Sequence, residues 1–523
     1  MTNGAQALIA TLVDSGVQVC FANPGTSEMH FVAALDSVPQ MRGVLCLFEG
    51  VVTGAADGYA RVAAKPAATL LHLGPGLGNG LANLHNARRA HVPVVNVIGD
   101  HATYHKKYDA PLESDIEPLT DWTHGWVRRT NSGDDVGRDA AEAVAESMSS
   151  PAQVANLILP ADISWEDGAQ AAGPVDPVPA AAPDAQAVAD VAAVLGSGEP
   201  VAILIGGPAV ADVRALEATD RIVAATGARA LVETFPARLV RGAGVPAIDR
   251  LGYLAEQAAF QLDGIKHLVV AGTRAPVSFF AYPGKASDLV PEGCVVHNLA
   301  GLETDVVAAL EQLAQAVAAG VQPRPAPAAR PELPTGQLTP QNWVQVIGAL
   351  LPDNAIISDE SNTSGLMLPA ATAGAPRHDV LTLTGGAIGQ GLPVALGAAV
   401  AAPDRPVIAL QADGSAAYTI SALWTMAREN LNVTTVLINN SSYAILRLEL
   451  ARVGAAGEGG QYGPKAEALL DLSRPNMDFA KIAEGFGVPA TVATTCEELA
   501  EQFRRAVAEP GPHLIDARIP TLF

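Results

Sequence analysis

Polar residues that could bind a metal ion end two neighbouring apolar runs near the C-terminus. Asp413-Gly-Ser follows the run VIALQA, and Asn439-Asn440 follows TTVLI, with Asn440 27 positions after Asp413. The segment 420–429 between them has a helical pattern, so one strand–helix–strand crossover would bring the two strand ends side by side. A carboxylate, an amide oxygen and a nearby backbone carbonyl are ligands that Mg²⁺ uses when it bridges to a phosphate. Each motif alone is common in turns and strand ends, but the pair at this separation favours a metal–phosphate site.

A single glutamate near the N-terminus is a second candidate for chemistry. Glu49 opens the segment EGVVTGAADGYAR, whose small residues predict a tightly packed helix ending near Arg61. An acid in the first turn of a helix is favoured by the helix dipole alone. The flanks GVLCLF and GVV are apolar, however, and predict a buried carboxylate that could share a proton with a ligand.

Two more polar groups follow apolar runs in the same part of the chain. The loop Asn23-Pro-Gly-Thr-Ser-Glu28 offers the hydroxyls of Thr26 and Ser27, and His72 ends the run ATLLH. A lone histidine in such a place is more often structural than catalytic. The glycines after His72 do not form a dinucleotide fingerprint, because Asn79 stands where the third glycine of G-x-G-x-x-G belongs.

The elements that must position these residues are short apolar runs alternating with alanine-rich helical stretches. This alternation predicts an α/β protein with doubly wound parallel sheets, which bind ligands at the carboxyl ends of their strands. Proline-rich stretches at 165–184 and 321–337 predict extended linkers. The linkers divide the chain into three predicted domains, at 1–168, 185–322 and 338–523. The clearest predicted strands are Val94–Ile98, Val201–Ile205, His267–Ala271, Val407–Leu410 and Thr434–Ile438.

Composition limits the class of function. The 523 residues are 49% hydrophobic and 16% charged, and the formal net charge is −22, which would repel nucleic acid and anionic membranes. The four cysteines form no C-x-x-C pair, which argues against a zinc site or a disulfide framework. The chain opens without a basic leader, and no apolar run reaches the ~20 residues that span a bilayer. We therefore expect a cytoplasmic protein that acts on small molecules.

The metal motif resembles a known family. The stretch DGSAAYTISALWT, together with Asn439-Asn440, is similar to the thiamine diphosphate motif of the superfamily that includes pyruvate oxidase, acetolactate synthase and benzoylformate decarboxylase. Ala412 departs from the glycine usual there, and a methyl group should be tolerated if the backbone is ordinary. The resemblance implies that Asp413, Asn440 and the carbonyl of Ser442 hold Mg²⁺. It also implies that the diphosphate end of the cofactor is contacted by Gly414, Ser415, Tyr418 and Tyr443.

The resemblance extends to other segments. Asp359-Glu-Ser-Asn-Thr363 is similar to a loop that enters the cofactor site, which implies contacts from Ser361, Asn362 and Thr363. Gly385 to Pro393 resembles the loop that bends thiamine, with Ile388 as its apolar wedge and Gly386 as a further residue in contact with the cofactor. Glu49 matches the glutamate that activates the cofactor through its pyrimidine ring. Thr26 or Ser27 and His72 match groups that handle the substrate and its protons.

The resemblance implies cleavage or formation of a carbon–carbon bond in a 2-oxo acid. Decarboxylation would be followed by release of an aldehyde or by carboligation, as in acetolactate synthase. The segment 275–282 lacks the second histidine of benzoylformate decarboxylase, and Asp100 replaces a glutamine common in synthases. Chains labelled acetolactate synthase large-subunit-like share FANPGTSEMHF almost verbatim, a label that names a lineage more securely than a reaction. FAD is not indicated.

Three alternative functions are considered, and the resemblance also implies an oligomeric state. The chain could be a paralogue that binds the cofactor without turnover, an acyloin or 2-hydroxyacyl-CoA lyase, or a flavin- or nicotinamide-linked redox enzyme. In this superfamily the glutamate of one subunit reaches the cofactor held by another, so we expect a homodimer or homotetramer with its active sites between subunits. The sequence leaves open the physiological substrate, a regulatory subunit and the choice between dimer and tetramer.

Overall fold

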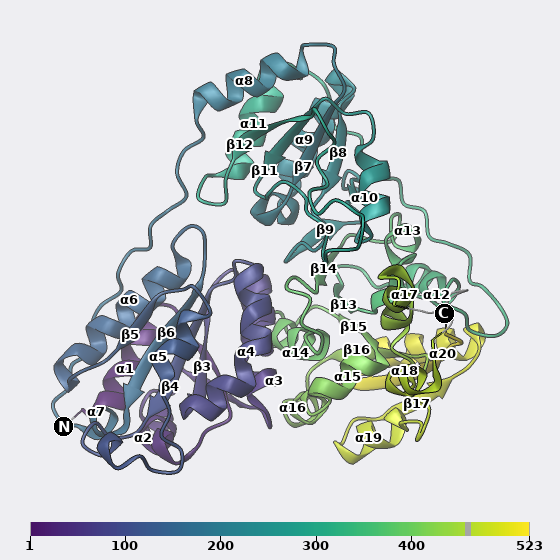
Figure 1. Cartoon of the computed structure of the whole chain (residues 1–523). Helices are drawn as coiled ribbons and strands as arrows, with labels where there is room; N and C mark the ends of the chain where they lie inside the picture. Colours follow the sequence, from purple (N-terminus) through teal and green to yellow (C-terminus); the bar gives the residue numbers. More distant parts are fainter. Residues whose placement is uncertain (1, 456–461, 522–523) are drawn as a thin grey trace.

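The computed structural model of the chain describes residues 2–455 and 462–521. It consists of three α/β layers, each a mostly parallel sheet with its covering helices (Figure 1). The predicted domains 1–168 and 338–523 therefore include a few residues, at 1, 456–461 and 522–523, that lie outside the described part. The predicted fold class is confirmed. The predicted linkers are long stretches with almost no helix or strand.

The first sheet has the strand order β2-β1-β3-β4-β6-β5, and every pairing in it is parallel. Its strands are β1 (Val19–Ala22), β2 (Arg42–Leu45), β3 (Ala67–His72), β4 (Val94–Asp100), β5 (Val127–Arg129) and β6 (Val154–Pro160). Its α-helices are α1 (Gly4–Asp14), α2 (Met29–Ala34), α3 (Glu49–Ala63), α4 (Leu73–Arg89), α5 (Ile116–Asp121), α6 (Val136–Met148) and α7 (Ala161–Trp165), and short 3₁₀ turns include η1 (Thr26–Glu28). Asn3 starts α1 with a reciprocal capping box to Gln6.

The second sheet, in the order β10-β8-β7-β11-β12, is also parallel. Its strands are β7 (Val201–Ile205), β8 (Arg229–Val232), β10 (Asp249–Arg250), β11 (His267–Ala271) and β12 (Val295–Ala300). Its α-helices are α8 (Ala185–Leu195), α9 (Val213–Thr226), α10 (Ala255–Leu262) and α11 (Val306–Val317). The predicted strands at 201–205 and 267–271 are confirmed residue for residue.

The third sheet is larger and includes one antiparallel strand. Its order is β17-β18-β16-β15-β13-β14-β9, and β9 (Leu239–Arg241), from the middle of the chain, pairs antiparallel with β14. This antiparallel pairing was not predicted from the sequence. The other strands are β13 (Ile356–Glu360), β14 (His378–Thr382), β15 (Val407–Ala412), β16 (Val433–Asn439), β17 (Ala490–Ala493) and β18 (His513–Arg518). The α-helices are α12 (Trp343–Leu350), α13 (Leu368–Ala371), α14 (Gly391–Ala401), α15 (Asp413–Thr419), α16 (Ala422–Arg428), α17 (Ala444–Arg452), α18 (Pro464–Leu470), α19 (Phe479–Gly485) and α20 (Cys496–Ala508).

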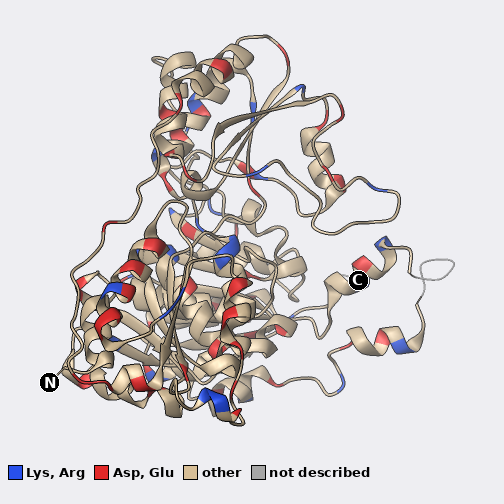
Figure 2. Ribbon diagram, turned by 60° about the vertical axis from the view of Figure 1, so that its left-hand side comes forward, with Lys and Arg blue, Asp and Glu red and all other residues tan. Residues whose placement is uncertain are grey.

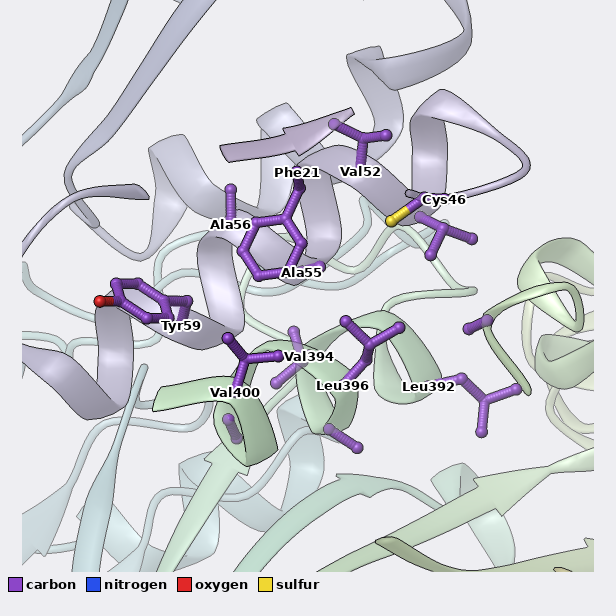
Figure 3. Packing of buried hydrophobic residues seen from close by; sticks show 14 of the residues in the cluster. Phe21, Cys46, Val52, Ala55, Ala56, Tyr59, Leu392, Val394, Leu396 and Val400 are labelled. Carbon is purple, nitrogen blue, oxygen red and sulfur yellow. The ribbon is translucent and has the colours of Figure 1, made fainter. Parts of the chain in front are cut away.

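The first and third layers share one hydrophobic core. Helix α3 lies against α14, and Figure 3 shows Ala55 of α3 on the side of Val394 and Leu396 of α14, whereas Val52 and Ala56 point away from α14. Glycines let the two backbones approach. A Cβ atom on Gly58 would lie 2.2 Å from the carbonyl oxygen of Val394, and one on Gly397 would lie 1.9 Å from that of Ala55. The small residues read from the sequence as a tight helix therefore form an interdomain contact.

Candidate active site

A glutamate, a histidine and a second glutamate meet at the carboxyl end of the first sheet. Glu49 is the first residue of α3 and is only 6% exposed, as its apolar flanks predict. Its Oε2 accepts a hydrogen bond of 3.0 Å from Asn79 Nδ2. A Cβ atom on Gly76 would lie 3.3 Å from both Glu49 Oε1 and the Cβ of His72, so these two side chains flank the same glycine.

His72 is held by a residue to which the sequence analysis gave no role. The Nδ1 atom of His72 lies 2.8 Å from Glu28 Oε2, which also accepts a 2.8 Å hydrogen bond from the backbone N–H of Gly25. Glu28 is 3% exposed, and burial raises the pKa of its carboxyl although His72 opposes the shift. Its Oε1 has no hydrogen-bond partner within the described residues and lies against the backbone of Gly99. An acid that follows a buried strand within a turn was the signal that could have identified Glu28.

The two predicted hydroxyl groups lie beside this pair. Thr26 and Ser27 belong to η1, directly before Glu28, with Thr26 exposed and Ser27 half-buried. Their turn follows β1, so their backbone is fixed next to Gly25, whose Cα lies under the His72 ring. Leu73 follows His72 with a φ of +53°, which is a strained backbone conformation for a residue other than glycine. Strained conformations of this kind cluster at functional sites.

The predicted metal ligands are neighbours at the carboxyl end of the third sheet. Strands β15 and β16 are paired in parallel, as expected, and the segment between them contains α16. Asp413 Oδ2 accepts hydrogen bonds from the backbone N–H groups of Asn440 (3.1 Å) and Ser441 (2.6 Å), and Oδ1 accepts one from Gly414 (2.8 Å). Burial raises the pKa of Asp413 to about 6 although these donors lower it.

The rest of this loop is also held by close contacts. Asn440 Oδ1 accepts a 3.0 Å hydrogen bond from the N–H of Ser442, and Ser441 between them has a φ of +52°. Ala412 has an ordinary extended backbone (φ −73°, ψ 147°), so the methyl group that departs from the family's glycine causes no strain. The ring of Tyr443 lies so close to Gly414 that a Cβ there would be 2.5 Å away.

The loop after β13 meets the same place. Asn362 Nδ2 donates a 2.9 Å hydrogen bond to Ser415 Oγ, which joins two of the predicted cofactor-binding segments. Asn362 has a φ of +51°, Ser361 is buried with its hydroxyl on Asp359, and Thr363 is half-buried next in the chain. The predicted phosphate-binding side chains are therefore gathered at one sheet edge.

The segment 385–391 lies between two groups of residues, one around Glu49 and His72 at the first sheet and the other around Asp413 at the third. Gly386 has a φ of +77° and takes the ring of Phe279 against its Cα, and Gly389 is covered by Tyr418. Ile388 between them is half-buried. Within the described residues, no hydrogen bond links the Glu49 carboxylate to the Asp413 loop of the same chain.

The site fits the cofactor that its sequence motifs imply. A magnesium ion bound to a diphosphate needs oxygen ligands, and Asp413 presents a buried carboxylate whose Oδ1 accepts one hydrogen bond from the part of the chain that the structure describes. The charged form of such a carboxylate is costly without a cation, as its raised pKa indicates. No group of three or more histidine, cysteine, aspartate or glutamate side chains that could hold a metal occurs in residues 2–455 and 462–521. That result is compatible with a site built on one aspartate, an amide and a carbonyl.

Comparison with known proteins defines the class of this fold and site. The N-terminal thiamine pyrophosphate-binding domain of thiamine pyrophosphate enzymes matches residues 2–124, and the C-terminal thiamine pyrophosphate-binding domain matches residues 359–517. These matches cover more than half of the chain and include both groups of residues described above. The chain belongs to the thiamine pyrophosphate enzyme family.

Individual relatives span the whole chain. A Mycobacterium tuberculosis protein provisionally named acetolactate synthase large subunit IlvX is 66% identical over 99% of both chains. Benzoylformate decarboxylase of Pseudomonas aeruginosa is 29% identical over 97% of both. The structure of a thiamine diphosphate-dependent 4-hydroxybenzoylformate decarboxylase from Rhodococcus jostii RHA1 superposes with a TM-score of 0.84 at 25% identity, covering 99% of both chains. The chain is thus a thiamine pyrophosphate-dependent enzyme related to acetolactate synthase and benzoylformate decarboxylase.

Proposed function

We propose that this enzyme uses thiamine diphosphate and Mg²⁺ to cleave the bond beside the carbonyl of a 2-oxo acid, followed by aldehyde release or carboligation. The observation that carries the proposal is the pairing of Asp413 with the Asn440–Ser442 loop, in a chain that also buries Glu49 at the start of α3. When bound, the cofactor supplies a carbon nucleophile and an electron sink. The domain limits 1–168, 185–322 and 338–523 are part of the proposal.

The third sheet would hold the diphosphate end of the cofactor. Asp413 and Asn440, with the carbonyl of Ser442, provide oxygen ligands to the metal, and the hydroxyls and amides around Ser415 bind phosphate oxygens. The remaining contacts are assigned to Ser361, Asn362, Thr363, Gly386, Ile388, Gly414, Tyr418 and Tyr443.

The first sheet would handle protons. Glu49 exchanges a proton with the pyrimidine end of the cofactor, and Asn79 fixes the direction of its carboxylate. His72 moves protons near the substrate, and Glu28 orients its ring by accepting from Nδ1. Thr26 or Ser27 supplies a hydroxyl to the substrate carboxylate from the turn beside Gly25.

Two subunits would complete each site. Large apolar side chains are exposed beside both groups of residues, which is typical of surfaces that a partner covers. Leu47, two residues before Glu49, is 45% exposed, and Tyr418 and Leu366 are 57% and 62% exposed near the Asp413 loop. We therefore propose a homodimer, or a homotetramer built from two dimers.

The fate of the substrate carbon is the open part of the reaction. Segment 275–282 places Phe279, not a histidine, against Gly386 of the loop with Ile388. The phenyl ring of Phe279, unlike an imidazole, has no proton to donate there, which favours ligation to a second carbonyl over protonation.

The test combines product analysis with cofactor binding. The enzyme with thiamine diphosphate and Mg²⁺ is incubated with a panel of 2-oxo acids, with and without acceptor aldehydes or acyl-CoA compounds, and products are identified by mass. We expect CO₂ release with at least one 2-oxo acid. Asp413→Ala should abolish the Mg²⁺-dependent binding of thiamine diphosphate measured by calorimetry. Saturable cofactor binding without CO₂ or product from any substrate would refute the proposed reaction, and undiminished binding by Asp413→Ala would refute the metal site.

A further inference from the structure

The loop that presents Ile388 is fixed on one side by a buried glutamate. Glu360, the last residue of β13, is 2% exposed and directs both carboxylate oxygens at this loop. Its Oε1 accepts a 2.7 Å hydrogen bond from the N–H of Gly389, and its Oε2 accepts one of 2.6 Å from that of Gly391. Gln411 Nε2 donates a third, of 2.9 Å, to Oε2. This buried carboxyl group accepts three hydrogen bonds, two of them from the backbone of glycines.

The same loop is fixed on its other side by a buried asparagine from the first sheet. Asn86, on α4, is fully buried and pairs with the backbone of Ala387 through both atoms of its amide. Its Nδ2 donates a 2.8 Å hydrogen bond to the carbonyl of Ala387, and its Oδ1 accepts one of 3.2 Å from the N–H of the same residue. The residue before Ile388 is therefore held by one domain, and the residue after it by another.

The carbonyl of Gly389 completes this arrangement. This carbonyl accepts a 2.9 Å hydrogen bond from Thr419 Oγ1, while the N–H of the same residue donates to Glu360. The two residues that flank Ile388, Ala387 and Gly389, therefore each have both the backbone N–H and the C=O hydrogen-bonded, which restricts the conformational freedom of the loop. Ile388 itself, between these two held residues, is left to meet a ligand.

We propose that Glu360 and Asn86 are positioning residues that hold Ile388 in place from opposite sides, so that the loop already has its cofactor-binding shape before the cofactor arrives. Preorganised loops bind more tightly because the cost of ordering them is met during folding. The inference rests on the proposed thiamine diphosphate site. It adds two residues outside the cofactor-contacting set, acting through the backbone.

The test uses one isosteric variant and one matched control. In Glu360→Gln the shape is kept, but the side chain has one acceptor and one donor where two acceptors are required, so an N–H of Gly389 or Gly391 loses its partner. Ser358→Ala is the control, because Ser358 is also buried on β13 and donates a 2.8 Å hydrogen bond to the carbonyl of Gly391. That contact leaves both flanks of Ile388 untouched.

Two measurements are made on the apo protein and on its titration with thiamine diphosphate and Mg²⁺. Amide hydrogen exchange at 389 and 391 should be at least ~10-fold faster in Glu360→Gln, with exchange in α9 unchanged, because the opening is local. The Kd for thiamine diphosphate should rise at least ~10-fold in Glu360→Gln and in Asn86→Ala, and stay unchanged in Ser358→Ala.

The outcomes separate this inference from the proposed function. Equal Kd values for Glu360→Gln, Asn86→Ala and the control would overturn it, as would unchanged exchange at 389 and 391. If the wild-type protein bound no thiamine diphosphate, the proposed function would fail. In that event hydrogen exchange in the apo protein would still decide whether Glu360 fixes the loop.

Discussion

At the scale of single residues, the proposed chemistry depends on carboxylates that the fold buries near the carboxyl ends of parallel strands. Asp413 and Glu49 were found from the sequence, because each stands at a boundary between an apolar run and a helix. Glu28 and Glu360 occupy comparable places but were passed over. Their partners, His72 and the loop 389–391, are distant in sequence, and only the fold brings them within hydrogen-bond distance.

Glu28 provides a prediction at this scale. Glu28→Gln keeps the shape of the side chain but weakens its attraction for the proton on His72, so kcat should fall ~10- to 100-fold. Stability should stay the same or rise, because a buried carboxylate with an unpartnered Oε1 is replaced by a neutral group. Turnover measurements and thermal unfolding check both parts. Wild-type kcat in this variant would remove Glu28 from the proton-handling group.

At the scale of elements, strands were predicted better than the contacts between layers. Uninterrupted apolar runs identify buried parallel strands, and β7 and β11 match their predicted limits. The helix from Glu49 was also predicted, and the structure ends it at Ala63. The antiparallel pairing of β9 with β14 was not predictable. β9 has only three residues, and so short a segment carries no pattern that identifies a partner strand about 140 positions away.

The contact between α3 and α14 can be tested with matched glycine substitutions. Gly58→Ala places a methyl group 2.2 Å from the backbone oxygen of Val394, which cannot move as a flexible side chain could, so we expect a loss of ~1–3 kcal/mol in unfolding free energy. Gly485→Ala, in α19, meets no atom within 4 Å and should be neutral or stabilising by up to ~1 kcal/mol. Denaturant unfolding compares the two. Equal stability of both variants would mean that the helices are not in close contact.

At the scale of the whole molecule, the fold separates the two groups of residues that the proposed chemistry requires. The first sheet holds Glu49 and His72, the third holds Asp413, and the shared core fixes the two sheets against each other. Aspartate and glutamate residues are spread over all parts of the chain (Figure 2). Among the described residues, a search for helices with the length and hydropathy needed to span a membrane found none. Both groups of residues were identified from the sequence, and the proposed function joins them into one site through a second chain.

Complementation between two inactive variants tests this central claim most directly. Glu49→Gln should lower turnover at least ~100-fold while the cofactor stays bound, and Asp413→Ala should be inactive for want of metal. When the two variants are unfolded together and refolded as mixed dimers, one site per heterodimer combines an intact Glu49 with an intact Asp413. We predict recovery of about one quarter of wild-type activity, the statistical share for random pairing in a twofold dimer. Mixed dimers that form but regain no activity would contradict the account.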